Sequence, residues 1–447
     1  MIERLARWFD QRLRAVSALR AGATKVFPEH WSFMVGEIAL YSFVVLVLTG
    51  TYLALFFDAG MERQPYTGSY VPLRGVEVSA AYRSALDLSF DVRAGRFVRQ
   101  VHHWAALVFV AAIVVHLLRV FFTGAFRRPR ELNWIVGVTL LLLAILTGFA
   151  GYSLLDDLLS GVGLRIGFSI LESIPVVGEW LAFGVFGGPF PGDVILGRLF
   201  IAHVFVLPLL ILGLLTVHLL VIFRQKHTQF PGELRTEDNV VGDALWPTYA
   251  AKSVGLLFIV AAVLAALGGF AQINPIWLYG PYEPATVTSG AQPDWYMGWL
   301  EGALRLMPPV EVVAFGYEIP SLFFPAVLLP GVTFAGLYLY PFVEQWVSGA
   351  SRREHHLLDR PRDHLVRTSL GVAVFTFYAV LLVAGANDII ADVLDVPIGV
   401  VVGVLRVALF VLPVAAAAVA VVVCRQLRRS DVHAGHKEAV RQAADTH

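Results

Sequence analysis

The chain has 447 residues, of which 57% are apolar and 15% are charged, and its mean hydropathy is +0.68. This balance lies far outside that of ordinary soluble domains and indicates a protein embedded in a lipid bilayer. Lys and Arg together number 34, as do Asp and Glu, so the net charge gives no indication of a nucleic-acid partner. The single cysteine, Cys424, excludes an intrachain disulfide, a cysteine-ligated iron–sulfur cluster and a covalently attached CxxCH haem. Any haem would therefore be held by histidine or methionine.

Residues 1–30 precede the first apolar run and contain six basic side chains. They carry no small-residue cleavage site, which argues against a removed signal peptide. Between residues 2 and 19, apolar side chains alternate with arginines at helical spacing. This pattern predicts a cytoplasmic amphipathic helix that lies on the membrane surface.

Eight apolar stretches are long enough to cross a bilayer, which takes roughly 20 residues. The sequence therefore predicts an all-α integral membrane protein with eight transmembrane helices. The predicted spans lie at about 33–57, 103–122, 134–154, 200–223, 254–274, 322–346, 366–386 and 399–424.

Charged residues sort the connecting loops into two kinds. Arginine and lysine gather after the second, fourth, sixth and eighth spans, whereas the loops after the third, fifth and seventh spans carry aspartate and glutamate with fewer basic residues. By the positive-inside rule, both termini are expected in the cytoplasm, with the chain in the cell membrane. Two long loops, at 155–199 and 275–321, then lie on the outer side. Long loops on one face of a helical bundle commonly build a functional site.

Four histidines lie inside two of the predicted spans: His102 and His116 in the second, His203 and His218 in the fourth. A step of 14 residues is close to four helical turns, so His102 and His116 share a face about 21 Å apart along the axis. Both spans run from outside to inside, so His102 is expected to face His203 near the outer surface, and His116 to face His218 nearer the cytoplasm. Each pair can ligate one haem iron and leave no open position, which suits electron transfer. A single histidine could instead be a polar contact between helices, but four in this register favour two haems.

Glycines repeat the same step, with Gly36 and Gly50 in the first span and Gly137 and Gly151 in the third. A porphyrin edge needs neighbouring helices without side chains at its own depth. Glycine is also common in membrane helices for other reasons, so the shared period is the informative feature.

Two arginines and a third histidine accompany the ligand candidates in the second span. Arg99 and Arg119 lie three residues from a histidine near opposite ends of the span, where each could pair with haem propionates or extend to the membrane interface. His103 follows His102 directly, so it points roughly 100° away from the ligand face. A supporting or packing role is expected for it.

With these features in place, the sequence resembles the cytochrome b/b6 family. The outer loop contains Pro293-Asp294-Trp295-Tyr296, which looks like the family's PEWY motif with Asp in place of Glu. The 15-residue step between His203 and His218 is like the b6 branch. Stretches such as FPEHWSFMVGEIALYSF (27–43), RFVRQVHHWAALVF (96–109) and QKHTQFPG (225–232) resemble the actinobacterial branch, and the likeness runs from about residue 20 to 430.

The resemblance implies a domain order and a reaction. Residues 31–230 would form the domain whose first four helices hold two b-type haems, 231–425 the domain with the quinol-oxidation loop, and 426–447 a cytoplasmic tail. A quinol, expected to be menaquinol, would be oxidised at the outer side. One electron would pass to a Rieske [2Fe-2S] partner and the other through the outer and inner haems to a quinone near the cytoplasm, with a contribution to proton translocation. This is the activity of a quinol:cytochrome c reductase.

Site residues follow from the same resemblance. Asp294 is expected to accept a quinol proton, because a carboxylate in a partly dry loop can hold a proton and rotate toward water, although it could also simply cap the loop. Tyr296 would orient the quinol head group. For an inner quinone site the candidates are Glu37, His227 and Lys252, each of which could instead be a solvated interfacial residue. No role is predicted for the polar pair that follows the seventh span, Asn387 and Asp388.

The implied partners are a Rieske subunit, a cytochrome c subunit expected to be dihaem, membrane lipid, a second copy in a dimeric complex, and a cytochrome c oxidase in a supercomplex. Two rival functions remain open. A b-type anchor of a dehydrogenase would share the histidines without needing eight spans. In a secondary transporter the histidines would titrate and no haem would copurify.

Overall fold

A computed structural model describes residues 2–13, 20–286, 288, 290–314, 316–349 and 353–445. Within these residues, eight helical segments have the length and hydropathy needed to cross a membrane, and all eight predicted spans are confirmed. Their regular helical parts are α3 (Val35–Ala54), α5 (Gly95–Phe122), α6 (Glu131–Ser153), α10 (Leu207–Arg224), α11 (Ala250–Phe270), α14 (Leu329–Ser348), α15 (Leu365–Ala384) and α17 (Ile398–Asp445).

Several span boundaries differ from the prediction. The second span begins at Gly95 rather than at 103, because its helix continues past the apolar run and carries Arg96 and Arg99. The fifth begins at Leu245 and ends at Phe270, short of 274, where Ala271 turns to an extended conformation. The last helix continues unbroken beyond residue 425. Hydropathy locates the lipid-facing part of a helix, whereas caps and turns decide where the helix ends.

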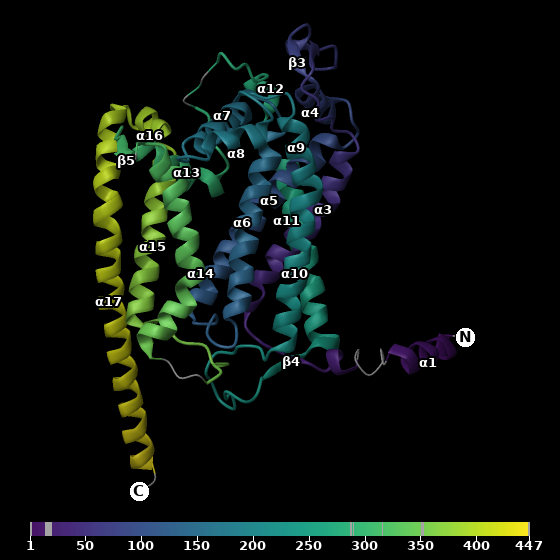
Figure 1. Cartoon of the computed structure of the whole chain (residues 1–447). Helices are drawn as coiled ribbons and strands as arrows, with labels where there is room; N and C mark the ends of the chain where they lie inside the picture. Colours follow the sequence, from purple (N-terminus) through teal and green to yellow (C-terminus); the bar gives the residue numbers. More distant parts are fainter. Residues whose placement is uncertain are drawn as a thin grey trace.

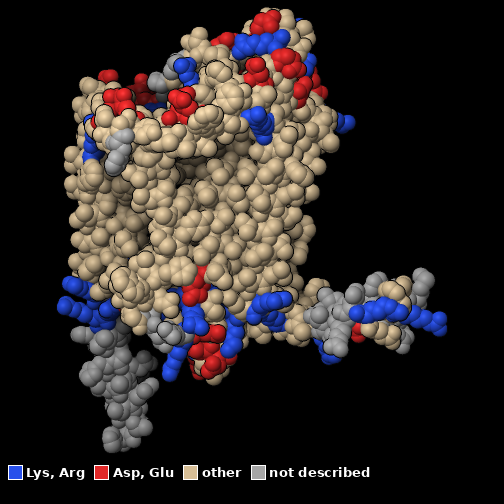
Figure 2. Space-filling model, in the orientation of Figure 1, with Lys and Arg blue, Asp and Glu red and all other residues tan. Residues whose placement is uncertain are grey.

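The spans are apolar on all sides because lipid covers most of their surface. In the apolar window of the fourth span, Ile195–Arg224, only 6% of the residues are buried inside the chain. Hydrocarbon offers no hydrogen-bond partners, and a helix needs none because its backbone N–H and C=O groups bond to one another. Figure 2 shows the result as a broad uncharged belt, with the Lys, Arg, Asp and Glu side chains gathered at its two ends.

The spans form two packed groups. In the first, α3 packs on α5, α6 packs on α10, and α11 covers α3 and α5. In the second, α15 packs on α17, and α14 is joined to α15 by the hydrogen bond between Thr333 and Tyr378 and by the Arg367–Glu344 pair. Helix α14 also contacts α6 of the first group. The short helix α13 (Trp295–Leu306) contacts α15 and α17 as well as α5, so it bridges the groups. Figure 1 shows α13 at the upper end of the bundle.

Most of the connecting structure lies at that same upper, outer-loop end (Figure 1). It comprises β2 (Arg63–Pro65) paired antiparallel with β3 (Glu77–Ser79), α4 (Ala80–Phe90), α7 (Leu158–Glu172), α8 (Gly178–Phe186), α12 (Ile276–Tyr279), the hairpin β5 (Val312–Ala314) and β6 (Tyr317–Ile319), and α16 (Asn387–Leu394). Helix α9 (Ile195–Ile201) continues through the π-helical turn Ala202–Val206 into α10.

At the opposite end, β1 (Val26–Pro28) pairs antiparallel with β4 (Gly242–Ala244), and the amphipathic helix α1 (Ile2–Leu13) extends sideways (Figure 1). The remaining short helical turns are Trp31–Phe33, Val71–Leu73, Leu245–Tyr249, Phe324–Leu328 and Pro361–Asp363. Helix formation in the predicted amphipathic segment is confirmed for residues 2–13, and residues 14–19 lie outside the described part.

Candidate functional site

The four intramembrane histidines come together as two facing pairs. The ring centroids of His102 and His203 are 6.1 Å apart with planes at 75°, and those of His116 and His218 are 6.4 Å apart at 74°. Two imidazoles bound to opposite sides of one metal at about 2 Å would place their centroids about 6 Å apart. Both pairs therefore have the spacing of a bis-histidine haem site, one near each end of the first helix group.

Hydrogen bonds orient the outer pair. His102 Nδ1 lies 2.9 Å from the Thr49 hydroxyl, which itself donates to the carbonyl of Val45, and His203 Nδ1 lies 2.8 Å from the carbonyl of Thr147. Both partners are therefore acceptors, so Nδ1 carries the proton and Nε2 of each ring is free to ligate a metal. For the inner pair, Nδ1 of His116 and of His218 is buried without a hydrogen-bond partner among the described residues.

Each of the four predicted glycines lies against one of the four histidine rings. A Cβ at Gly50 would lie 3.0 Å from Cε1 of His102, and a Cβ at Gly151 would overlap the ring of His203. The pairs are Gly36 with His116, Gly50 with His102, Gly137 with His218, and Gly151 with His203. The glycines on α3 and α6 thus leave room at the two depths where the histidines meet.

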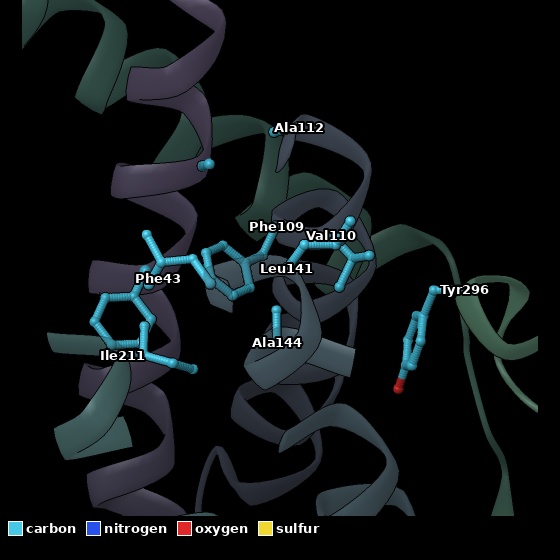
Figure 3. Close-up of a cluster of buried hydrophobic side chains, with 10 residues drawn as sticks. Phe43, Phe109, Val110, Ala112, Leu141, Ala144, Ile211 and Tyr296 are labelled. Carbon is cyan, nitrogen blue, oxygen red and sulfur yellow. The ribbon is translucent and has the colours of Figure 1, made fainter. Parts of the chain in front are cut away.

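An apolar layer separates the two histidine pairs. It is formed by buried side chains that lie about midway between the paired residues on their helices, namely Phe43, Phe109, Ala144 and Ile211. The rings of Phe43 and Phe109 stack at 5.6 Å with planes at 29°. Figure 3 shows this cluster between the helices, with Tyr296 standing at its edge on a separate segment. The layer keeps the two candidate haem sites apart and dry.

Arg99 and Arg119 have the unsatisfied donors that a bound anion would complete. Nε of Arg99 and both Nε and Nη2 of Arg119 are buried without a hydrogen-bond partner among the described residues. Arg99 Nη2 donates to the carbonyl of Asn274 at 3.0 Å, and Arg119 lies over the ring of Phe33 at 4.2 Å. Buried guanidinium groups need acceptors, and haem propionates beside each histidine pair would supply them. The chain's residues therefore fit two non-covalent haems.

The outer loop places Asp294 at the edge of the outer histidine pair. Asp294 directly precedes α13, yet its side chain makes no capping hydrogen bond. Its Oδ1 lies 2.8 Å from Nε2 of His103, and the Tyr296 hydroxyl donates to its Oδ2 at 3.2 Å. All three side chains line a cavity of about 250 Å³ that also exposes His102 and His203.

Tyr296 is held deep in this cavity. The residue is 3% exposed, and a Cβ at Gly148 on α6 would overlap its hydroxyl, so the glycine leaves the space that the Tyr296 ring occupies. Burial, together with the negative charge of Asp294, raises the pKa of Tyr296 well above its usual value. The phenol therefore stays protonated and acts as a hydrogen-bond donor.

The candidates for an inner quinone site only partly come together. The Glu37 carboxylate accepts hydrogen bonds from the Ser253 hydroxyl at 2.6 Å and from the Tyr249 hydroxyl. The ring of Phe27 contacts two other rings, with centroid distances of 4.4 Å to Tyr249 and 4.3 Å to His227. Burial lowers the pKa of His227 to about 4, so the imidazole is neutral at physiological pH.

Lys252 lies apart from this cluster. Its ammonium group is half exposed and pairs with Glu29, at 3.0 Å, and with Asp243. The sequence did not predict the contact of Tyr249 with Glu37 or that of His103 with Asp294. Each contact joins residues about 200 positions apart, and no local sequence pattern indicates it.

Asn387 and Asp388 now have a structural role. Arg305, at the end of α13, donates to Asn387 Oδ1 at 2.7 Å and pairs with Asp388 Oδ1 at 2.8 Å. The amide of Gln292 donates to the same Asp388 oxygen at 2.9 Å. Asn387 and Asp388 therefore connect α16 to Gln292, which precedes α13, and to Arg305, near its end.

Eight spans, two histidine pairs at haem spacing and matching glycines define the class of membrane cytochrome that carries two haems in a helical bundle. A family model described as cytochrome b (N-terminal)/b6/petB matches residues 107–281. Cytochrome bc1 complex cytochrome b subunits are similar over nearly the whole chain. That of Streptomyces coelicolor is 50% identical over 435 residues, which are 96% of this chain and 78% of the relative.

The corresponding subunit of Corynebacterium diphtheriae is 51% identical over 94% of this chain and 78% of the relative. That of Mycobacterium tuberculosis is 50% identical over 96% of this chain and 78% of the relative. Among solved structures, a chain of a hyperthermophilic respiratory Complex III has the same fold, with a TM-score of 0.68, 20% identity, and coverage of 93% of this chain and 98% of the other. The chain belongs to the family of cytochrome b subunits of cytochrome bc1 complexes.

Proposed function

We propose that this chain is the quinol-oxidising subunit of a respiratory quinol:cytochrome c reductase, with its quinol site under the outer loop. The observation that carries the proposal is the shared cavity, because Asp294 and Tyr296 line the same space as the outer histidine pair. A proton acceptor, a hydrogen-bond donor and an electron acceptor would then meet at one bound quinol. The resemblance of the sequence to the actinobacterial branch implies menaquinol as the substrate.

Two b-type haems would be held by this chain's histidines, the outer one by His102 and His203 and the inner one by His116 and His218. Arg99 would pair with the outer propionates and Arg119 with the inner ones. When bound, each haem supplies a one-electron redox centre. The protein contributes the ligand geometry, the glycine surfaces that admit the rings, and the apolar layer between them.

At the quinol site, Asp294 would accept a proton from the substrate hydroxyl and Tyr296 would orient the head group. A carboxylate serves as a general base when it lies within hydrogen-bond reach of the proton that it takes. Its position before α13, near the outer surface of the bundle, gives the proton a short route to water. At the inner end, Glu37 and His227, together with Tyr249, would bind a quinone, with the neutral His227 imidazole as a hydrogen-bonding group.

In the assembled complex, a Rieske [2Fe-2S] subunit would take the other electron and a cytochrome c subunit, expected to be dihaem, would carry it onward. We also infer a dimeric complex, association with a cytochrome c oxidase, and cytoplasmic termini. The concentration of basic residues in the loops beside the termini supports this orientation.

The Asp294→Asn variant tests the proposed function. Asparagine keeps the size and hydrogen bonding of aspartate but cannot take a proton, so steady-state quinol oxidation by the assembled complex should slow at least about tenfold, equivalent to about 1.4 kcal/mol of barrier. Both haem signals in the reduced-minus-oxidised absorption spectrum should remain. Asp294→Glu, which restores the carboxylate, should keep much of the activity. Normal turnover of Asp294→Asn across pH would exclude Asp294 as the proton acceptor.

A further inference from the structure

The Asp294 carboxylate is held from both helix groups. Oδ1 lies 2.8 Å from Nε2 of His103 on α5, and Oδ2 accepts from Tyr296 on α13 at 3.2 Å. An ionised carboxylate only accepts hydrogen bonds, so Nε2 must carry the proton in this pair. The side chains of His103 and Asp294 are 13% and 15% exposed. A charge-assisted hydrogen bond in so dry a site is stronger than the same bond in water.

The backbone of α13 is fixed without any help from His103. A Cβ at Gly302 would overlap the carbonyl of Leu381, and a Cβ at Gly385 would lie 2.6 Å from the carbonyl of Gly298, so α13 packs backbone to backbone against the end of α15. The Arg305 and Gln292 contacts to Asp388 secure the two ends of the segment. The second helix group therefore holds α13 through contacts that do not involve His103, whereas the direction of the Asp294 carboxylate depends on His103 of α5.

His103 also lies outside the ligand face of its own helix. It follows His102 by one residue, so its ring is turned roughly 100° from the face that meets His203. It lines the same cavity as Asp294 and Tyr296. A purely packing position would favour an apolar side chain, because a buried imidazole N–H requires an acceptor. The Asp294 carboxylate is that acceptor.

We propose that His103 is a positioning residue for quinol oxidation, which fixes Oδ1 of Asp294 so that Oδ2 faces the substrate hydroxyl. This inference rests on the proposed function of Asp294. The longer bond from Tyr296 to Oδ2 is the one that a quinol hydroxyl replaces, and the shorter bond from His103 stays in place. The quinol O–H bond then breaks, its proton bonds to Oδ2, and the electron pair remains on the quinolate oxygen. Oδ1 of the neutral acid still accepts from His103.

A double-mutant cycle with a rescue variant tests this role. His103→Leu removes the donor, whereas His103→Gln places an amide N–H at a reach similar to that of Nε2. Each is made alone and combined with Asp294→Asn, and kcat and KM for quinol oxidation are measured in the assembled complex. Reduced-minus-oxidised spectra report whether both haems are retained. Should His103→Leu lose the outer haem, His103→Asn, whose shorter amide cannot reach Oδ1, takes its place in the cycle.

We expect His103→Leu to lower kcat about tenfold with KM within about twofold of the wild type, and His103→Gln to recover most of the loss. In the Asp294→Asn background, His103→Leu should cause no further loss, since the carboxylate that it positions is gone. An additive loss in the double variant, or a Gln variant as slow as the Leu variant, overturns the positioning role. Normal turnover of His103→Leu together with slow turnover of Asp294→Asn also overturns the positioning role, but it leaves the proposed function of Asp294 intact. Normal turnover of Asp294→Asn overturns both the positioning role of His103 and the proposed function of Asp294.

Discussion

The outer histidines are held by a hydroxyl on α3 and a carbonyl on α6, so the two rings are oriented by helices other than their own. The acceptors fix the tautomer, and the facing Nε2 atoms become the only nitrogens available to iron. The inner ring of His116 has no such partner among the described residues. Two haems held by these pairs would therefore differ in the surroundings of their ligands, which is one of the ways a protein sets apart the potentials of two identical cofactors.

Replacing a ligand should remove one haem at a time. His102→Ala or His203→Ala should abolish the outer haem signal and leave the inner one, and His116→Ala or His218→Ala should do the converse, because the pairs are separated by about 21 Å along the helix. Redox titration of the purified protein by absorption spectroscopy distinguishes the two signals. Retention of both haems in the His102→Ala and His116→Ala variants would refute the assignment.

The glycines allow an equally sharp test at the residue scale. Gly151→Val would place side-chain atoms where the ring of His203 lies, so the outer haem should be lost while the inner haem stays. Gly213→Val on α10 is the matched control, since a Cβ there meets nothing within 4 Å. Haem content per purified protein is the measurement. Equal haem content in the two variants would show that Gly151 does not shape the haem site.

At the scale of single elements, α13 depends on a charged cluster at its far end. The Glu301 side chain is 13% exposed and accepts from Arg305 Nε at 2.9 Å. Burial raises the pKa of Glu301 from 4.5 to about 7, with Arg305 opposing the shift and Asp388 adding to it. The folded protein therefore binds this proton more tightly than the unfolded chain does. The resulting stabilisation is full below pH 4.5 and is lost progressively as the pH rises to about 7.

Glu301→Gln should remove this pH dependence. The wild type should lose more thermal stability between pH 5 and 8 than the variant does, because glutamine has no proton to release. Thermal unfolding of the purified protein at a series of pH values is the measurement. Glu311→Gln, the same change at an exposed position of the outer loop, serves as the control and should follow the wild type. Parallel profiles for the wild type and Glu301→Gln would exclude Glu301 as the titrating group.

The elements themselves could largely be predicted from the sequence, whereas their contacts could not. A membrane span can be predicted from a continuous apolar run. That His102 and His116 share one face of a helix follows from helix geometry alone. The start of α5 at Gly95 was missed because a helix continues where hydropathy falls. The contact of His103 with Asp294 joins positions 191 apart, and it exists only because α13 bridges the two helix groups.

At the scale of the whole molecule, the two ends of the bundle are chemically different. Helices α13 and α16 lie at one end, while α1, β4 and the end of α17 lie at the other (Figure 1). Charged side chains gather at both ends and leave the belt between them bare (Figure 2). A chain with this asymmetry can release protons on one side of a membrane and take them up on the other only if its orientation is fixed.

That orientation can be measured because Cys424 is the single cysteine and is buried in α17. In a Cys424→Ser background, Ser430→Cys places an exposed thiol beside the tail and Thr286→Cys places one in the outer loop. With a membrane-impermeant maleimide, Ser430→Cys should react only in inverted membrane vesicles and Thr286→Cys only in right-side-out vesicles, as the positive-inside rule requires. Each variant is the control for the other, since both thiols should react after detergent solubilisation. The opposite pattern would put Asp294 on the cytoplasmic side, and quinol oxidation there would release its protons into the cell instead of out of it.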